Sequence, residues 1–157
     1  MISSVSDRSD IAHIDTDVPE KLNLGSGTCM DLNAEPSWKD VTYVVDFLVR
    51  NPDKIARVHI DIDTDVISDD HCLFIQVDPK GKLIVLFDCD ETRWNSACRI
   101  EEHDDPVSFA SGLQNALVRN NAALLSNILL LPPIVHDYYQ APASKYDNLY
   151  VSAVTIY

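Results

Sequence analysis

Residues 56–87 show the pattern of three consecutive β-strands, and this segment restricts the chain to folds that contain an antiparallel sheet. Residues 56–63 alternate between apolar and polar side chains, which is typical of a strand with one buried face. Two apolar runs, 72–77 and 82–87, follow, and the Asp-Pro-Lys-Gly sequence between them is typical of a tight turn. The second run is apolar at nearly every position, so we expect it in the centre of the sheet. The polar residues 65–70 are expected to connect the first two strands.

A helix is predicted over residues 37–50, before the strands. Ser37 is the expected N-cap, and Asp40 completes an acidic first turn. The Asn51-Pro52 pair ends the helix, because proline disfavours a helical conformation in the residue before it. The predicted buried face consists of apolar residues spaced by three and four: Trp38, Val41, Val44, Val45 and Leu48.

The C-terminal third is predicted to contain more helix and a last strand. Asp105 followed by Pro106 is typical of a helix start, since proline is favoured at the first helical position. A second helical stretch is expected over 122–131, and residues 149–156 are predicted to form a strand. The buried stripe of the first of these helices is expected to hold Phe109, Leu113 and Leu117.

The length and composition favour one domain, residues 1–157. The chain has 157 residues, of which 46% are hydrophobic, which suffices for a single core. Residues 1–27 are rich in Ser and Asp and are expected to be loosely ordered, and residues 28–33 are expected to form a short edge strand. The order of elements predicts an α+β fold. We expect a mixed, largely antiparallel sheet of four to six strands, with two or three helices packed on one face.

The charge of the chain is strongly negative and unevenly distributed. It has 25 acidic residues against 12 Lys and Arg, a formal net charge of -13. Residues 61–105 hold 13 acidic and 4 basic residues, a net of -9, whereas residues 106–157 hold two of each. Such a field attracts basic partners and disfavours nucleic acid and anionic membranes. Solubility alone is the competing explanation for this charge.

The sequence favours a cytoplasmic protein without a metal or redox cofactor. Residues 1–17 lack the apolar segment of a signal peptide, and the apolar run 128–135 is too short to span a bilayer. No two cysteines form a C-x-x-C pair, which argues against a zinc ribbon or redox motif and favours reduced thiols. The four cysteines are Cys29, Cys72, Cys89 and Cys98.

One segment matches a catalytic pattern. An apolar strand ending in Asp88-Cys-Asp90-Glu-Thr92 resembles the nucleophile motif of haloacid-dehalogenase-like phosphatases. The resemblance would make Asp88 the nucleophile and Asp90 the acid/base, with a magnesium ion. That family needs a parallel, doubly wound sheet, and no strand–helix alternation follows Thr92. We therefore predict no enzymatic activity.

A second segment has the spacing of a cation loop. Asp61, Asp63 and Asp65 match the first three ligand positions of an EF-hand, but the Gly and Glu needed at positions six and twelve are absent. His59, Asp61 and Asp63 share one strand face, which leaves a looser divalent site as an alternative. A solvated strand face is the favoured interpretation.

The acidic segment 61–105 is the predicted contact surface for a basic protein partner, with Trp94 as an aromatic anchor near it. The candidate partner-binding residues are Asp61, Asp63, Asp65, Asp69, Asp70, Asp88, Asp90, Glu91, Trp94, Glu101 and Glu102.

Residues 28–94 resemble the immunity proteins of bacterial polymorphic toxin systems, especially the first immunity family, some of which partner deaminase toxins. A short strand is followed by the helical sequence Trp38-Lys-Asp-Val-Thr-Tyr-Val-Val-Asp-Phe-Leu-Val-Arg and the strand Val58-His-Ile-Asp-Ile-Asp. The apolar strand pair is Leu73-Phe-Ile-Gln-Val-Asp-Pro-Lys-Gly-Lys-Leu-Ile-Val-Leu-Phe. Residues 105–157 depart from the family pattern, and the resemblance assigns no functional residue.

The leading hypothesis is therefore an acidic immunity protein (an antitoxin) that neutralises a cognate bacterial toxin by direct binding. Two alternatives remain open. One is an acidic DNA mimic or adaptor protein, which would bind nucleic-acid-binding proteins in a salt-sensitive way. The other is the phosphatase that uses Asp88 and Asp90.

Overall fold

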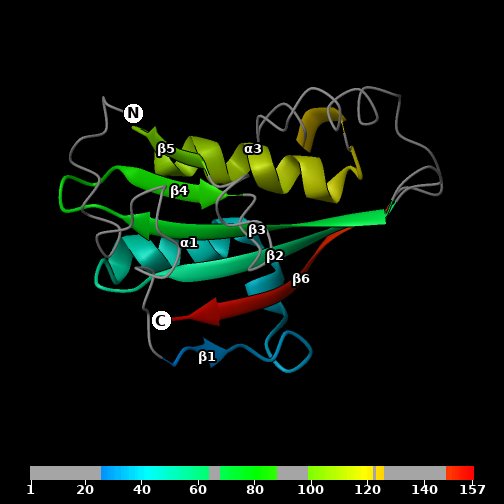
Figure 1. The fold of residues 1–157 in the computed structure, drawn as a ribbon, viewed down its shortest axis with the longest axis horizontal. Helices are drawn as coiled ribbons and strands as arrows, with labels where there is room; N and C mark the ends of the chain where they lie inside the picture. Colours follow the sequence, from blue (N-terminus) through cyan, green and yellow to red (C-terminus); the bar gives the residue numbers. More distant parts are fainter. Residues whose placement is uncertain (1–25, 64–67, 88–98, 122, 126–147) are drawn as a thin grey trace.

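The computed structural model describes residues 26–63, 68–87, 99–121, 123–125 and 148–157. These residues form a six-stranded sheet with the strand order β1-β6-β2-β3-β4-β5, and the helices α1 and α3 pack against it (Figure 1). All five strand pairings are antiparallel. The predicted α+β fold is confirmed.

Most elements lie where the sequence predicts them. The strands are β1 (Thr28–Cys29), β2 (Ala56–Asp63), β3 (Ser68–Val77), β4 (Leu83–Phe87), β5 (Arg99–His103) and β6 (Asn148–Ile156). The helices are the 3-10 helix η4 (Pro36–Lys39) and the α-helices α1 (Val41–Arg50) and α3 (Pro106–Val118). The edge strand predicted over 28–33 is shorter than expected and ends at Cys29.

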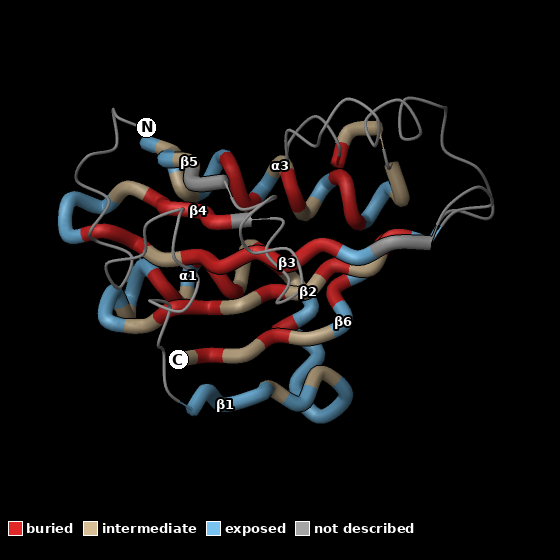
Figure 2. The backbone as a smooth tube through the Cα atoms, in the orientation of Figure 1, coloured by how far each residue is buried: buried red, intermediate tan, exposed pale blue. Residues whose placement is uncertain are grey.

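The main core lies between one face of the sheet and the helices α1 and α3. All five predicted apolar residues of the first helical segment are buried, and so is the predicted stripe of α3. They belong to one cluster with the inward residues of β2, β3, β4 and β6, and the buried stretches of these elements are red in Figure 2. The inward residues of β2 are Ala56, Val58, Ile60 and Ile62.

The first α-helix begins later than the sequence suggested, and the prediction of Ser37 as its N-cap is wrong. Pro36 starts a 3-10 turn that contains Ser37, and Asp40 then adopts an extended conformation that separates this turn from α1. The Asp40 carboxylate accepts a hydrogen bond of 2.8 Å from the Thr42 amide and so caps the helix. Trp38 in the 3-10 turn packs edge-on against Tyr43 of α1.

Two predictions about polar segments of the sheet are also wrong. Ser68 already pairs with Asp63, so β3 begins within the segment 65–70 that was expected to be a connection. Arg99–His103 forms β5, although the sequence pattern predicted no strand between Phe87 and Asp105, where most residues are polar. Both strands form because backbone hydrogen bonds to a neighbouring strand do not depend on apolar side chains.

The predicted start of α3 is confirmed. Asp105 is its N-cap and accepts a hydrogen bond of 3.1 Å from the Ser108 amide, and Pro106 is the first helical residue. The helix ends at Val118, and Asn120, two residues later, has a positive φ of 49°. Of the helical stretch predicted over 122–131, residues 123–125 are helical and the rest lies outside the described residues.

The sheet has a second face, opposite α1 and α3, which we call the outer face. Its central part is apolar: Phe74 and Ile84 are buried, and Phe74 packs against Tyr157. Both faces of β4 are buried, and β4 lies between β3 and β5, so it is an interior strand as predicted, although it is next to the edge of the sheet rather than at its centre. The outer face of β2 is polar instead, and this part of the sheet carries the candidate site. In the part of the chain that the structure describes, no helix is long and apolar enough to cross a membrane.

Candidate functional site

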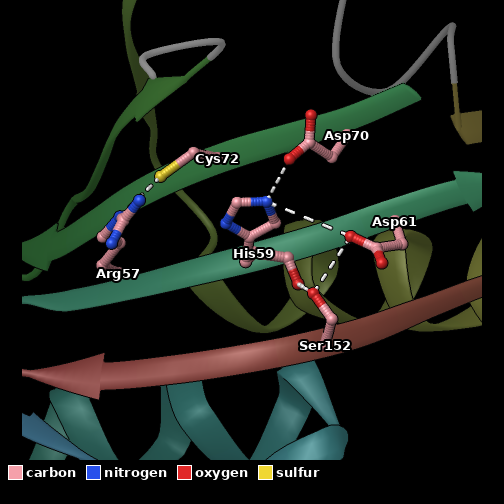
Figure 3. Close-up of polar contacts among 6 residues, drawn as sticks. All are labelled: Arg57, His59, Asp61, Asp70, Cys72 and Ser152. Carbon is pink, nitrogen blue, oxygen red and sulfur yellow. Dashed lines mark hydrogen bonds and ion pairs between the residues drawn. The ribbon is translucent and has the colours of Figure 1, made fainter. Parts of the chain in front are cut away.

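Three polar side chains converge on the outer face where β2 and β3 run side by side. His59 Nε2 lies 2.5 Å from Asp70 Oδ2 and 4.0 Å from Asp61 Oδ1 (Figure 3). One ligand atom from each residue lies within 4.8 Å of the other two. We call these residues the His59 cluster. It is partly shielded from solvent, with side-chain exposures of 24% for His59, 34% for Asp61 and 50% for Asp70.

The strand register explains why these residues meet. His59 and Asp61 are two positions apart in β2, so their side chains point to the same face. Asp61 pairs with Asp70 across the β2–β3 ladder, while His59 pairs with Cys72. The contact between His59 and Asp70 is therefore diagonal, a separation that a long or aromatic side chain spans. Since Val58, Ile60 and Ile62 anchor the opposite side of β2 in the core, the orientation of the cluster is fixed.

An irregularity in β6 supplies a fourth polar group. The β2–β6 register shifts between His59 and Ile60, so that Ser152 is an extra residue without a Cα partner in β2. Its hydroxyl oxygen lies 3.1 Å from Asp61 Oδ1, to which it donates, and 3.4 Å from the His59 carbonyl oxygen. The bulge thus places a donor against Asp61 from the strand on the other side of β2 (Figure 3).

Arg57 borders the cluster along β2. Its Nε donates to Cys72 Sγ at 3.1 Å, and Cys72 is buried. Figure 3 shows the Arg57 side chain extending toward Cys72, away from the two aspartates. The outer face of β2 therefore changes from a cationic residue at Arg57 to acidic residues at Asp61 and Asp63.

Tyr150 in β6 lies close to these acidic residues, and their negative charge changes its pKa. Its hydroxyl group hydrogen-bonds to Asp61, and this bond and the charges of Asp61 and Asp63 raise the pKa of Tyr150 above its ordinary value. The physical cause is that a phenolate would lose the hydrogen bond and repel the nearby carboxylates.

We expect the substitution Asp61→Asn to lower the pKa of Tyr150 toward about 10, the ordinary value of tyrosine. The asparagine side chain removes the charge that opposes formation of the phenolate. The measurement is a pH titration of the ¹³Cζ resonance of Tyr150, assigned by its loss in Tyr150→Phe. Asp46→Asn, on the exposed side of α1, is the matched control. An unchanged titration in Asp61→Asn would contradict the contact.

The structure brings together part of the predicted partner-binding surface. Asp61, Asp63 and Asp70 lie at the same end of the β2–β3 pair, and Asp69 is in β3 opposite Ile62. Asp63 and Asp70 are exposed. Five of the predicted residues lie outside the described part of the chain: Asp65, Asp88, Asp90, Glu91 and Trp94.

Glu101 and Glu102 lie at the opposite end of the sheet. In the ladder, Val77 of β3 is opposite Leu83, which is opposite His103 of β5. Glu102 and Glu101 come just before His103 and are level with Gln76 and Ile75, which are six and five residues from Asp70, or about 20 and 17 Å along a strand at roughly 3.3 Å per residue. The two glutamates also point to opposite faces, because they pair with the neighbouring residues Val85 and Ile84 of β4. They are thus separate from the His59 cluster.

A basic residue, Lys82, lies among the acidic residues at this end of the sheet. Lys82 Nζ lies 3.4 Å from Glu102 Oε1 and 3.4 Å from Asp104 Oδ1. The hydrogen bond and charge of Asp104, followed by those of Glu102, raise the pKa of Lys82 above its ordinary value. An open hollow lies nearby, lined by residues that include Glu102, Asp104, Asp105 and Phe109.

Some of the site could not be read from the sequence. The alternation of β2 indicates that His59 and Asp61 share a face with Asp63, but the residue that contacts His59 is Asp70. No local signal marks Ser152 or Tyr150 as neighbours of Asp61, because both belong to a strand about 90 positions further along the chain.

Comparison with known proteins gave no match: no family model, no curated protein and no solved structure is similar to this chain.

Proposed function

We propose that the protein is an acidic immunity protein that neutralises a bacterial toxin in the cytoplasm by direct binding. The observation that carries this proposal is the grouping of Asp61, Asp63 and Asp70 at one end of the outer face, within a chain of formal net charge -13. Carboxylates held side by side on a sheet generate a local negative potential. A basic substrate channel of a toxin is a complementary partner for such a surface.

The arrangement supports recognition better than catalysis of phosphoryl transfer. The strand before Asp88 is β4, which pairs antiparallel with both of its neighbours. The phosphatase motif instead follows a strand of a parallel sheet, so this surrounding structure does not favour the phosphatase alternative. Exposed carboxylates on a rigid sheet are suited to steering a partner, because long-range attraction raises association rates.

A direct test begins with the neighbouring genes: if one of them encodes a toxin-like domain, that domain is co-expressed with this chain. We expect the wild-type chain to protect cells from that domain and to bind it when purified. The double substitution Asp61→Asn/Asp63→Asn should lower the association rate constant about tenfold at low salt, because steering depends on these charges. Stopped-flow or surface plasmon resonance measurements at several salt concentrations, in buffer containing EDTA, give the rate and its salt dependence.

The control is Asp46→Asn/Asp53→Asn, which removes the same charge from α1 and the turn after it. Both of these aspartates are exposed. Equal losses in the two double variants would mean that only net charge matters, and unchanged association in Asp61→Asn/Asp63→Asn would refute the proposed surface. Salt-sensitive binding to nucleic-acid-binding proteins without protection from a toxin would favour the DNA-mimic alternative.

A further inference from the structure

We propose that the His59 cluster is a binding site for a divalent transition-metal ion, with Zn²⁺ as the best-fitting ion. The ligands are His59 Nε2 and one carboxylate oxygen each from Asp61 and Asp70. This proposal does not require the proposed function, but the two share Asp61 and Asp70, so a bound cation would reduce the negative charge that these residues offer to a protein partner.

The donor set is of the kind that binds zinc. Imidazole nitrogen and carboxylate oxygen are both common zinc ligands, whereas Mg²⁺ prefers an all-oxygen environment. The nitrogen of His59 therefore distinguishes the cluster from a group of acidic residues alone. The three ligand atoms already lie within 4.8 Å of one another without an ion between them.

The distances can adapt to an ion through small side-chain movements. Zinc bonds to nitrogen and oxygen are about 2.0–2.2 Å long, so two ligands in tetrahedral coordination are roughly 3.3 Å apart. The His59–Asp70 distance of 2.5 Å is shorter than this, and the His59–Asp61 distance of 4.0 Å is longer. Shifts of under about 1 Å would bring these two pairs to the required separation, and the Asp61–Asp70 pair, which lies within 4.8 Å, needs a shift of at most about 1.5 Å. Rotations of side chains that are one-third to one-half exposed provide such shifts without moving the strands.

The surroundings hold the ligands in place. His59 and Asp61 are on β2, which is hydrogen-bonded to β3 on one side and β6 on the other. The Ser152 hydroxyl donates to Asp61 Oδ1, the same oxygen that lies 4.0 Å from His59 Nε2, and so helps to hold this carboxylate turned toward His59. Hydrogen bonds of this kind orient ligating carboxylates, and losing one typically weakens metal binding 10- to 100-fold. Ser152 is thus a positioning residue.

The local charge also favours a cation. Asp61 and Asp70 offset the two positive charges of the ion, and Asp63 adds a further negative charge close to Tyr150 and Asp61. Three protein ligands leave at least one coordination position open, which is the arrangement of zinc sites that bind water or an external ligand. The outer-face position of the cluster makes that open position accessible from solvent.

The test is isothermal titration calorimetry of the full chain with ZnCl₂, after EDTA treatment and desalting. We expect one Zn²⁺ per chain with a Kd in the micromolar range. His59→Gln and Asp70→Asn should each weaken this binding at least tenfold, and Ser152→Ala should weaken it about tenfold while all three ligands remain. The same titration with MgCl₂ should give at least tenfold weaker binding, since His59 is a nitrogen ligand.

Matched controls separate this site from other zinc-binding groups of the chain. His103→Gln and Asp53→Asn remove a histidine and an aspartate outside the cluster, and both should bind Zn²⁺ like the wild type. The ¹⁵Nε2 resonance of His59 should shift on addition of ZnCl₂, and circular dichroism checks that each variant is folded. Zinc affinity that is unchanged in both His59→Gln and Asp70→Asn, or the absence of any binding up to millimolar ZnCl₂, would overturn the proposal.

Discussion

Replacing Leu48 with alanine is expected to lower the free energy of unfolding by about 3–5 kcal/mol, within the range for large-to-small changes in protein cores. Leu48 is on the inner side of α1, its side chain is fully buried, and it belongs to the core cluster shared with β2, β3 and α3. The substitution removes buried apolar contacts and leaves a cavity that the surrounding elements refill only in part. Urea unfolding followed by circular dichroism measures the loss as a lower midpoint at an unchanged m value.

The next residue in the same helix provides the control. Val49 is 46% exposed, so Val49→Ala changes little apolar burial and should alter stability by less than about 0.5 kcal/mol. Both substitutions introduce alanine, so both carry the small benefit of its high helix propensity. Similar losses of stability in the two variants would mean that α1 does not pack on the sheet through the Leu48 side.

The parts of the fold that the sequence predicted are those in which local pattern and tertiary packing agree. The spacing of apolar residues predicted the buried side of α1, because a helix repeats about every 3.6 residues. The alternation over 56–63 predicted β2 with the bounds that the structure has, and the buried residues are the predicted ones. Asp105-Pro106 marked the start of α3, since the cap and the first helical position have their own residue preferences.

The parts that were missed are strands whose existence depends on a neighbour. Arg99–His103 is rich in charged residues, and it forms β5 by pairing with β4 at the edge of the sheet. Charged edge strands are common because they discourage pairing with other chains. The first residues of β3 are likewise polar, and their strand structure comes from the register with β2. Neither strand has an apolar pattern of its own.

The candidate site shows the same limit. Sequence spacing is sufficient to place His59 and Asp61 on one face, because both are on β2. The approach of Asp70 requires the β2–β3 register, and that of Ser152 requires the bulge in β6. A one-residue shift in either register would direct these side chains to the other face of the sheet. The composition of the site was therefore partly predictable, whereas its geometry was not.

Replacing Asp78 with alanine is expected to lower the free energy of unfolding by about 2–3 kcal/mol. Each hydrogen bond to a charged group contributes roughly 1.5–3 kcal/mol. The expected loss is less than the sum for two such bonds, because water can partly replace the lost acceptor in the turn. Asp78 is buried, with 6% exposure, in the turn between β3 and β4. Its Oδ1 accepts hydrogen bonds of 2.9 Å from the Lys80 amide and 2.8 Å from the Lys82 amide. Alanine removes the acceptor for both amides while Gly81, at a φ of 88°, still has to close the turn.

Asp78→Asn separates the loss of the acceptor from the loss of charge. The asparagine carbonyl oxygen can still accept from both amides, so this variant should lose about half as much stability as Asp78→Ala. Urea unfolding gives the stabilities, and amide hydrogen exchange shows whether the Lys80 and Lys82 amides lose protection in Asp78→Ala and keep part of it in Asp78→Asn. Equal destabilisation by the two substitutions, with equal exchange rates, would mean that the negative charge of Asp78 and not its hydrogen bonds stabilises the turn. In the predicted case, one carboxylate oxygen stabilises the turn that joins β3 to β4, at a position where the sequence predicted a turn.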